Sequence, residues 1–350
     1  VKFACYNGLI PNQKEGTLLI EISHLTKRYG EHLAVSDLSF TVDSGQIYGF
    51  LGPNGAGKST TMNIMTGCLS ATEGSVRIDG HDIFEEPNQA KKLIGYLPEQ
   101  PPLYMNETPE EYLRFVGEAK GLRGEDLERQ MDEVISQTGI EEVAHRRISA
   151  LSKGYKQRVG IAQALLGSPK VIILDEPTVG LDPIQIIEIR DLIKELGQIH
   201  TVIFSSHILS EVQAICDQII MIAKGKLIAF DAAENLEKLL LSPNEITILS
   251  DGSPTQVEEI LENLLHIITE VSVEETGEGY TFARIRTGCE NVYEFSRAVF
   301  SAFAASETAL LEMTVKKANL EDIFLELAEQ EASQLPAAEA KIMESEETEK

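Results

Sequence analysis

A glycine-rich segment with a lysine and two hydroxyl residues carries the strongest chemical signal in the sequence. It follows the apolar run QIYGFL and precedes TMNIMTGCL, so a strand, a tight turn and a helix are expected in that order. Glycine permits the turn, and the N–H groups at the start of the helix attract an anion. In this pattern lysine reaches the β- and γ-phosphates, serine holds Mg²⁺ and threonine lies near the α-phosphate. The residues of this predicted phosphate loop are Gly52, Pro53, Asn54, Gly55, Ala56, Gly57, Lys58, Ser59 and Thr60.

Two adjacent acidic residues follow another apolar run. The stretch 171–178, VIILDEPT, is predicted as a buried parallel strand because it begins with continuous apolar residues. Open α/β sheets bind ligands at the carboxyl ends of such strands. Phosphoryl transfer needs one carboxylate on Mg²⁺ and one group that orients the attacking water. We therefore expect Asp175 to anchor Mg²⁺ and Glu176 to act as the general base.

Three further residues have both a structural and a functional interpretation. Tyr29 could stack on an adenine ring or be a half-buried tyrosine of a hairpin, and its spacing favours neither. Ser152 is a natural N-cap for a helix that ends near Gly167, yet a helix N-terminus also binds anions, including one on another chain. His207 follows the buried strand 201–206 and is either a solvated residue at a helix start or a residue of the phosphate edge.

These residues require a mixed α/β framework to position them. The helix after residue 182 is expected to begin with Asp182 as N-cap and Pro183 in its first turn. Strands are expected at 18–22, 39–42, 75–78 (as an edge strand), 94–104 (broken at Pro98) and 219–230 (as a hairpin).

The region from about 105 to 165 is predicted to be a helical insert. Its first helix opens with a capping box of Thr108 and Glu111 and with Pro109 in the first turn. A second helix is closed by Gly139. The apolar faces are predicted to consist of Tyr112, Phe115, Val116 and Ala119 in the first helix, and of Leu127, Met131, Val134 and Ile135 in the second.

The periodicity beyond residue 230 predicts a second, smaller domain. Strands and helices alternate there as β-α-β-β-α-β, and a last helix capped by Asn319 follows. We divide the chain into a leader without an assigned role (1–16), a nucleotide-binding domain (17–230), an accessory α+β domain (231–330) and an acidic tail expected to be disordered (331–350).

Composition narrows the class of protein further. The net charge of the 350 residues is −26, and most of it lies beyond residue 230, which argues against nucleic acid or an anionic membrane surface as a partner. The four cysteines are too scattered for a metal site or a disulfide scaffold, so we expect a reducing cytoplasm. No apolar run approaches the roughly eighteen residues of a membrane-spanning helix.

Taken together, the motifs resemble those of the nucleotide-binding subunits of ABC transporters. GPNGAGKST is similar to the Walker A motif, VIILDEP to Walker B, LSKGY to the signature motif and VGLD to the D-loop. His207 and Tyr29 stand at the switch-histidine and adenine-stacking positions. The resemblance covers residues 18–230 and implies a P-loop ABC-type ATPase fold with bound ATP and Mg²⁺.

The resemblance also implies a partner. In this family two subunits pack head to tail, so that ATP on the Walker motifs of one copy also contacts the signature helix of the other. This gives Ser152 and Gly154 a role at the γ-phosphate of the partner's ATP. Glu176, His207 and Lys58 would be catalytic, and hydrolysis would release the two copies from one another. The partner is either a second copy or a related ATPase.

Two departures from the family pattern concern site residues. Lys153 and Tyr155 replace the Gly and Gln of the usual LSGGQ signature. After Tyr96 the family has a Gln following Pro, where this chain has Glu99 and then Gln100. Either residue could reach Mg²⁺ or its water, whereas Ser59 and Asp175 are the other expected ligands.

The leading hypothesis is an ATPase subunit that drives a separate integral membrane permease from the cytoplasmic face of the membrane. The ending LEDIFLELAEQ resembles subunits of the ABC-2 and gliding-motility type, which implies export. A soluble ABC ATPase that clamps another macromolecule is the alternative, although the chain lacks the basic face and second ATP domain expected of one. A non-hydrolysing nucleotide sensor is disfavoured by Glu176 and His207.

Overall fold

The computed structural model divides into two compact units, residues 1–233 and 234–350, and each is described here by itself. The structure describes residues 17–232, 235, 244–264, 268–277, 279–289 and 291–316. The predicted leader, the helix capped by Asn319 and the acidic tail lie outside the described residues.

A six-stranded sheet forms the centre of the first unit, with the strand order β10-β9-β3-β8-β7-β6. All of its pairs are parallel except β9 with β10, which form the predicted hairpin. Every residue of β3, β7 and β8 is buried, as expected of strands covered on both faces. The strands are β3 (Ile47–Leu51), β6 (Ile94–Leu97), β7 (Val171–Leu174), β8 (Thr201–Ser206), β9 (Gln218–Ala223) and β10 (Lys226–Ala232).

The prediction that the strand at 171 continues to Thr178 is wrong. Strand β7 ends at Leu174, and Glu176 has a φ of 47° in the left-handed region. The chain therefore turns out of the sheet before Pro177, which places Asp175 and Glu176 beyond the strand end.

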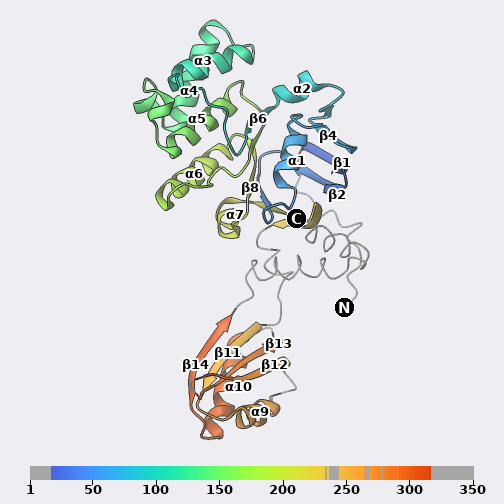
Figure 1. Cartoon of the computed structure of the whole chain (residues 1–350), viewed down its shortest axis with the longest axis vertical. Helices are drawn as coiled ribbons and strands as arrows, with labels where there is room; N and C mark the ends of the chain where they lie inside the picture. Colours follow the sequence, from blue (N-terminus) through green and yellow to red (C-terminus); the bar gives the residue numbers. More distant parts are fainter. Residues whose placement is uncertain are drawn as a thin grey trace, which may run out of the picture. The chain divides into compact units, whose positions relative to one another are not determined.

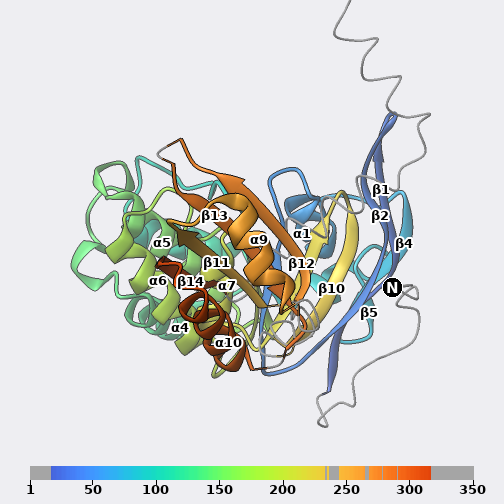
Figure 2. The same ribbon diagram turned by 90° about the horizontal axis from the view of Figure 1, so that it is seen from below.

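A four-stranded antiparallel sheet, in the order β2-β1-β4-β5, packs beside the first sheet. Figure 2 shows β1, β2 and β4 side by side, in blue. The strands are β1 (Leu18–Tyr29), β2 (His32–Asp43), β4 (Glu73–Ile78) and β5 (His81–Asp82). Two predictions are corrected. Strands β1 and β2 are one long hairpin that reaches Tyr29, and β4 is not an edge strand because the short β5 pairs with it.

Helix α1 (Lys58–Met65) joins the two sheets into one core. Its Met62, Ile64 and Met65 are fully buried and belong to the same apolar cluster as residues of β1, β3 and β7. The remaining helices of the sheet region are α2 (Pro87–Lys92), α6 (Pro183–Leu196) and α7 (Leu209–Ile215). Helix α6 starts as predicted, with Asp182 accepting hydrogen bonds from two backbone N–H groups and Pro183 in its first turn. Within the described parts of the chain, no helix meets the length and apolarity needed to cross a membrane.

The predicted helical insert forms a separate group of helices (Figure 1, shades of green). It contains α3 (Pro109–Ala119), α4 (Gly124–Thr138), two short 3-10 turns (Glu141–Val143 and Ile148–Ala150) and α5 (Lys153–Leu165). The capping box at Thr108 and the left-handed Gly139 at the end of α4 are both confirmed.

The predicted apolar face of α3 is partly wrong. The residues buried on that helix are Pro109, Tyr112, Leu113 and Gly117, whereas Phe115 and Ala119 are exposed. Gly117 lies against Leu127 of α4, where an added Cβ would come 2.4 Å from Leu127 Cδ1. The helices therefore approach one another over a small residue, and Phe115 instead contacts Tyr104, with ring centroids 5.3 Å apart.

The second unit has the predicted β-α-β-β-α-β order. Its antiparallel sheet has the strand order β12-β13-β11-β14, the ferredoxin-like arrangement. Buried residues of both helices, including Val257 and Phe295, form one core with Ile246 and Ile285 of the sheet. The elements are β11 (Asn244–Ser250), α9 (Pro254–Glu262), β12 (Ile268–Glu275), β13 (Thr281–Thr287), α10 (Val292–Ala305) and β14 (Leu310–Lys316).

Candidate functional site

A cavity of about 410 Å³ lies where β3, β7 and β8 end, and it gathers most of the predicted site residues. Its lining includes the phosphate loop from Pro53 to Thr60, together with Tyr29, Glu99, Glu176 and His207. His32, Ala34 and Val179 also line it and were not singled out by sequence reasoning. The carboxyl edge of the parallel sheet is thus where segments far apart in sequence meet.

The backbone of the phosphate loop adopts a conformation that requires glycine. Gly55 and Gly57 have φ values of 80° and 102°, and a Cβ on Gly57 would lie 2.6 Å from the carbonyl oxygen of Ala34. Helix α1 begins at the next residue, so its free N–H groups face the cavity side of the loop. The loop is therefore shaped for a group that backbone N–H donors can surround, such as a phosphate.

Glu176 contacts both Lys58 and His207 within this cavity. Lys58 Nζ lies 3.1 Å from Glu176 Oε1 and donates to the carbonyl oxygen of Gly52 at 2.7 Å. The other oxygen, Glu176 Oε2, is 3.0 Å from His207 Nδ1. Lys58 is 6% exposed and Glu176 is 7% exposed. The attraction between the two opposite charges offsets part of the desolvation cost of burying them.

A serine that sequence reasoning missed contacts the carboxylate of Asp175 and the backbone of Glu176. Ser205, at 0% exposure on β8, accepts a hydrogen bond from the backbone N–H of Glu176 at 2.7 Å and donates one to Asp175 Oδ1 at 2.7 Å. The available signal was a pair of serines at the end of TVIFSS, on the strand that pairs with the one directly preceding the acidic residues.

Tyr96 links β6 to the loop helix. Its hydroxyl donates to Asn63 Oδ1 at 3.2 Å, and Asn63 Nδ2 donates to the carbonyl oxygen of Ser59 at 2.8 Å. Burial raises the pKa of Tyr96 well above its usual value, and the negative charge of Asp175 raises it further. The tyrosine therefore stays protonated and remains a donor at neutral pH.

The predicted ligands of Mg²⁺ are chemically suitable for that ion. Ser59 offers a hydroxyl oxygen and Asp175 a carboxylate that is 2% exposed. Oxygen donors of this kind are those that Mg²⁺ prefers. Of the two alternatives after Tyr96, Glu99 lines the cavity, and both Glu99 and Gln100 are exposed.

Tyr29 stands at the open rim of the cavity. It is 48% exposed, and Lys27 Nζ lies 5.2 Å from the centre of its ring. Tyr29 ends β1 in the hairpin, as the structural alternative expects, and its exposed half leaves ring surface on which a flat base could stack.

Ser152 and Gly154 lie apart from the residues lining this cavity, at the start of α5. The Ser152 hydroxyl accepts a hydrogen bond from the backbone N–H of Tyr155 at 3.3 Å, which confirms it as an N-cap. A Cβ on Gly154 would come 2.8 Å from the side chain of Gln185. This close approach is a structural reason for a glycine at position 154. The atypical Lys153 places its ammonium group beside Gly180.

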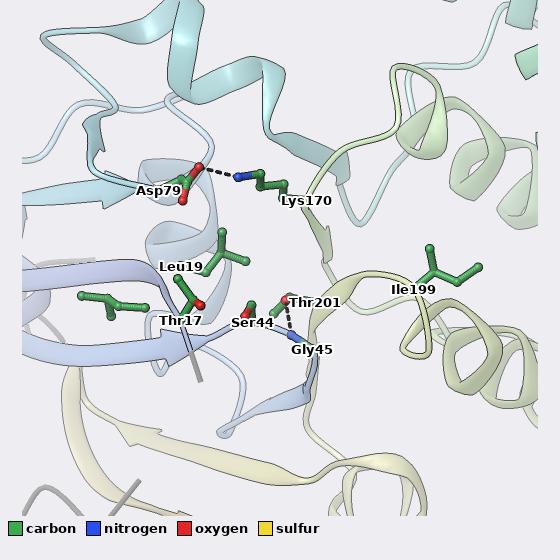
Figure 3. Close-up of a pocket in the computed structure, with 9 residues that line it drawn as sticks. Thr17, Leu19, Ser44, Gly45, Asp79, Lys170, Ile199 and Thr201 are labelled. Carbon is green, nitrogen blue, oxygen red and sulfur yellow. Dashed lines mark hydrogen bonds and ion pairs between the residues drawn. The ribbon is translucent and has the colours of Figure 1, made fainter. Parts of the chain in front are cut away.

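A second cavity, of about 330 Å³, opens at the opposite edge of the same sheet (Figure 3). Ser44 and Gly45 precede β3, Lys170 precedes β7 and Thr201 begins β8. Lys170 Nζ pairs with Asp79 Oδ2 at 2.6 Å across this cavity. None of the residues lining it was predicted to belong to a site.

A glycine-rich loop between β3 and α1, with a lysine and an acidic pair after a parallel strand, defines a P-loop nucleoside triphosphatase. Residues 35–179 match the family described as ABC transporter. The linearmycin resistance ATP-binding protein LnrL of Bacillus subtilis is 32% identical over 310 residues, which cover 88% of this chain and 98% of the relative. The bacitracin transport ATP-binding protein BcrA of Bacillus licheniformis is 39% identical over 222 residues, 63% of this chain and 72% of the relative.

A solved structure agrees with this relationship. A dimeric ATP-binding cassette in a post-hydrolysis state, bound to ADP and Pi, has a TM-score of 0.56 and 27% identity, covering 61% of this chain and 98% of its own. The chain belongs to the ABC transporter family as an ATP-binding subunit, and it is an ATPase.

Proposed function

We propose that this protein hydrolyses ATP as one half of a head-to-tail pair and so drives a separate membrane permease, for export. The observation that carries this proposal is the contact of the buried Glu176 with both Lys58 and His207 beside the phosphate loop. It brings a cation for the phosphates, a base for water and a histidine to one point.

ATP binding is assigned to the loop and to the rim. Backbone N–H groups of Gly55 to Thr60 surround the β-phosphate, and Lys58 exchanges part of its contact with Glu176 for phosphate oxygens. The adenine ring stacks on Tyr29, whose face is accessible. Ser59, Asp175 and either Glu99 or Gln100 would hold Mg²⁺, which would supply positive charge against the triphosphate.

Hydrolysis is assigned to the Glu176 and His207 pair. Glu176 accepts a proton from the attacking water as the new oxygen–phosphorus bond forms and the bond to ADP breaks. His207 orients the carboxylate through the contact at 3.0 Å and faces the γ-phosphate edge. Ser205 fixes the backbone of Glu176, so the base does not need to reorganise during the reaction.

The second half of the site is assigned to another copy or to a related ATPase. Ser152 and the N–H groups in the first turn of α5, that of Gly154 among them, bring a hydroxyl and a positive helix end to the γ-phosphate bound by the partner. The location of this helix start outside the cavity of its own chain supports an intermolecular role. Cleavage and phosphate release then separate the two copies.

Export is supported by the names of relatives. They include a lantibiotic transport ATP-binding protein, a bacitracin transport ATP-binding protein and a linearmycin resistance ATP-binding protein. We accordingly place the protein at the cytoplasmic face of a membrane through its permease. We assign residues 17–230 to ATP hydrolysis and residues 231–330 to an accessory domain.

The test is Glu176→Gln. Because a general base contributes on the order of 100- to 10,000-fold, phosphate release should fall by more than about 100-fold while ATP binding is kept. Size-exclusion chromatography with ATP should show a trapped dimer. Glu133→Gln is the matched control, since Glu133 is 50% exposed and pairs with Arg129 on α4. Normal turnover by Glu176→Gln would refute the base assignment, and purification of the complex from membranes, with identification of the bound integral protein, tests the permease partner.

A further inference from the structure

A buried carboxylate that the proposed mechanism does not use lies next to the candidate site. Glu211 on α7 is 2% exposed. Its Oε2 accepts a hydrogen bond from the hydroxyl of Thr178 at 2.7 Å and another from the hydroxyl of Ser206 at 3.0 Å. Both donors are themselves buried, at 5% and 0% exposure. One oxygen atom therefore joins two segments that are separate in sequence.

Both of these segments carry proposed catalytic residues. Thr178 comes two residues after Glu176, and Ser206 comes directly before His207. The Ser206 hydroxyl also accepts a hydrogen bond from the backbone N–H of Ile208 at 3.0 Å, so the chain is held on both sides of His207. The contact between Glu176 and His207 at 3.0 Å thus lies between two segments with a common anchor.

The negative charge of Glu211 is incompletely balanced by a cation. A contribution to stability alone therefore does not explain why a carboxylate is buried here. Arg190 Nη2 on α6 approaches Glu211 Oε1 only to 3.6 Å. Arg190 Nε is buried without a hydrogen-bond partner in the part of the chain that the structure describes. A buried charge pair of such geometry stabilises a fold poorly compared with apolar residues of similar volume. The two short hydroxyl contacts are its better-formed interactions.

We propose that Glu211 is a positioning residue for ATP hydrolysis: it sets the separation and orientation of Glu176 and His207 by holding Thr178 and Ser206. This inference rests on the roles proposed above for those two catalytic residues. A displacement of about 1 Å in a reacting group can cost on the order of 100-fold in rate, so an anchor outside the cavity can control turnover.

The test removes the two hydroxyls rather than the carboxylate, because Glu211→Ala leaves the partly buried Arg190 without its acidic partner and weakens the fold. Thr178→Val and Ser206→Ala should each lower kcat for phosphate release by about 10- to 100-fold and leave the Kd for ATP unchanged. Thr178→Ser keeps the hydroxyl and should retain most of the wild-type kcat.

The matched control is Thr138→Val on α4. Thr138 is 0% exposed and its hydroxyl donates to the carbonyl oxygen of Val134 at 2.7 Å, far along the chain from the site. This variant should lose thermal stability comparably to Thr178→Val but keep kcat. A double-mutant cycle that combines Thr178→Val with Glu211→Gln adds a second readout. If Thr178 and Glu211 act through one unit, Thr178→Val should lower kcat less in the Glu211→Gln variant than in the wild type.

The outcomes separate this inference from the proposed function. Suppose that Thr178→Val and Ser206→Ala are folded and keep the wild-type kcat, while the separate variant Glu176→Gln is inactive. That result would overturn the role of Glu211 and leave the general-base assignment intact. Normal turnover by Glu176→Gln would instead overturn the proposed function. A lower Tm with unchanged kcat in Thr178→Val, as in Thr138→Val, would reduce Glu211 to a structural residue.

Discussion

The two edges of the six-stranded sheet hold charge in opposite ways. At the carboxyl edge, Lys58 and Glu176 are a buried pair with contacts to loop carbonyls and to His207. At the amino edge, Lys170 and Asp79 pair across a cavity, but their side chains are 55% and 33% exposed. The same strands β3, β7 and β8 supply both edges.

The difference lies in what each pair costs and contributes. Solvent screens an exposed pair, which contributes little to stability whether or not it has a function. A buried pair carries a desolvation cost and persists only with good geometry. Burial of charge, rather than the presence of a cavity or an ion pair, therefore distinguishes the candidate site from the other edge.

Lys58→Ala is expected to have the largest effect. It removes charge-assisted hydrogen bonds to the phosphates, each of about 1.5–3 kcal/mol, so the Kd for ATP should rise on the order of 100-fold. It also leaves Glu176 as a buried carboxylate without its cation, which should lower the free energy of unfolding. Isothermal titration with ATP and a denaturant titration measure the two effects.

Lys58→Arg serves as the matched control, because it keeps the charge but not the compact ammonium group. Stability should recover more than ATP affinity does. If Lys58→Ala bound ATP like the wild type, the buried pair would be structural and the comparison between the edges would fail.

Tyr96→Phe is expected to have an intermediate effect. It removes the hydroxyl that donates to Asn63, which in turn holds the carbonyl oxygen of Ser59. One hydrogen bond of about 1 kcal/mol corresponds to no more than roughly a tenfold loss, and it should appear as a higher Mg²⁺ concentration for half-maximal turnover. Tyr104→Phe is a control outside this chain of contacts. An unchanged Mg²⁺ dependence would show that Ser59 needs no such support.

Lys170→Met should have the smallest effect. An exposed ion pair is worth about 0–1 kcal/mol, so the free energy of unfolding should change by less than about 1 kcal/mol, and less in high salt. ATP turnover should be unchanged. A marked loss of turnover would mean that the amino edge also takes part in the reaction and would remove the contrast.

The sequence was sufficient where a local signal determines the structure. Thr108, Asp182 and Gly139 act through contacts within a few residues, and their helix ends are confirmed. The strands β3, β7 and β8 followed from continuous apolar runs. The phosphate loop followed from glycine spacing, and its placement beside Glu176 and His207 followed from the rule that parallel strands bind ligands at their carboxyl ends.

Features that depend on contacts distant in sequence were missed. Helical periodicity identified an apolar face on α3 but not that Gly117 would mark the closest approach to α4, so Phe115 was wrongly included. The prediction that β4 is an edge strand was wrong because its partner β5 has only two residues, which give no periodic signal. Ser205 and Glu211 are ordinary residues in the sequence, and they gain importance only through partners about 30 residues away.

The left-handed backbone at Glu176 affects which substitutions are favoured at this position. That conformation costs a glutamate roughly 1–2 kcal/mol, whereas glycine adopts it freely and asparagine more easily. The proposed reaction requires a glutamate at position 176, whereas the left-handed backbone there favours glycine or asparagine. Replacing Glu176 by glycine or asparagine would relieve this backbone strain but would leave Lys58 as a buried cation without its carboxylate partner. The buried ion pair therefore opposes the substitution that the backbone alone would favour.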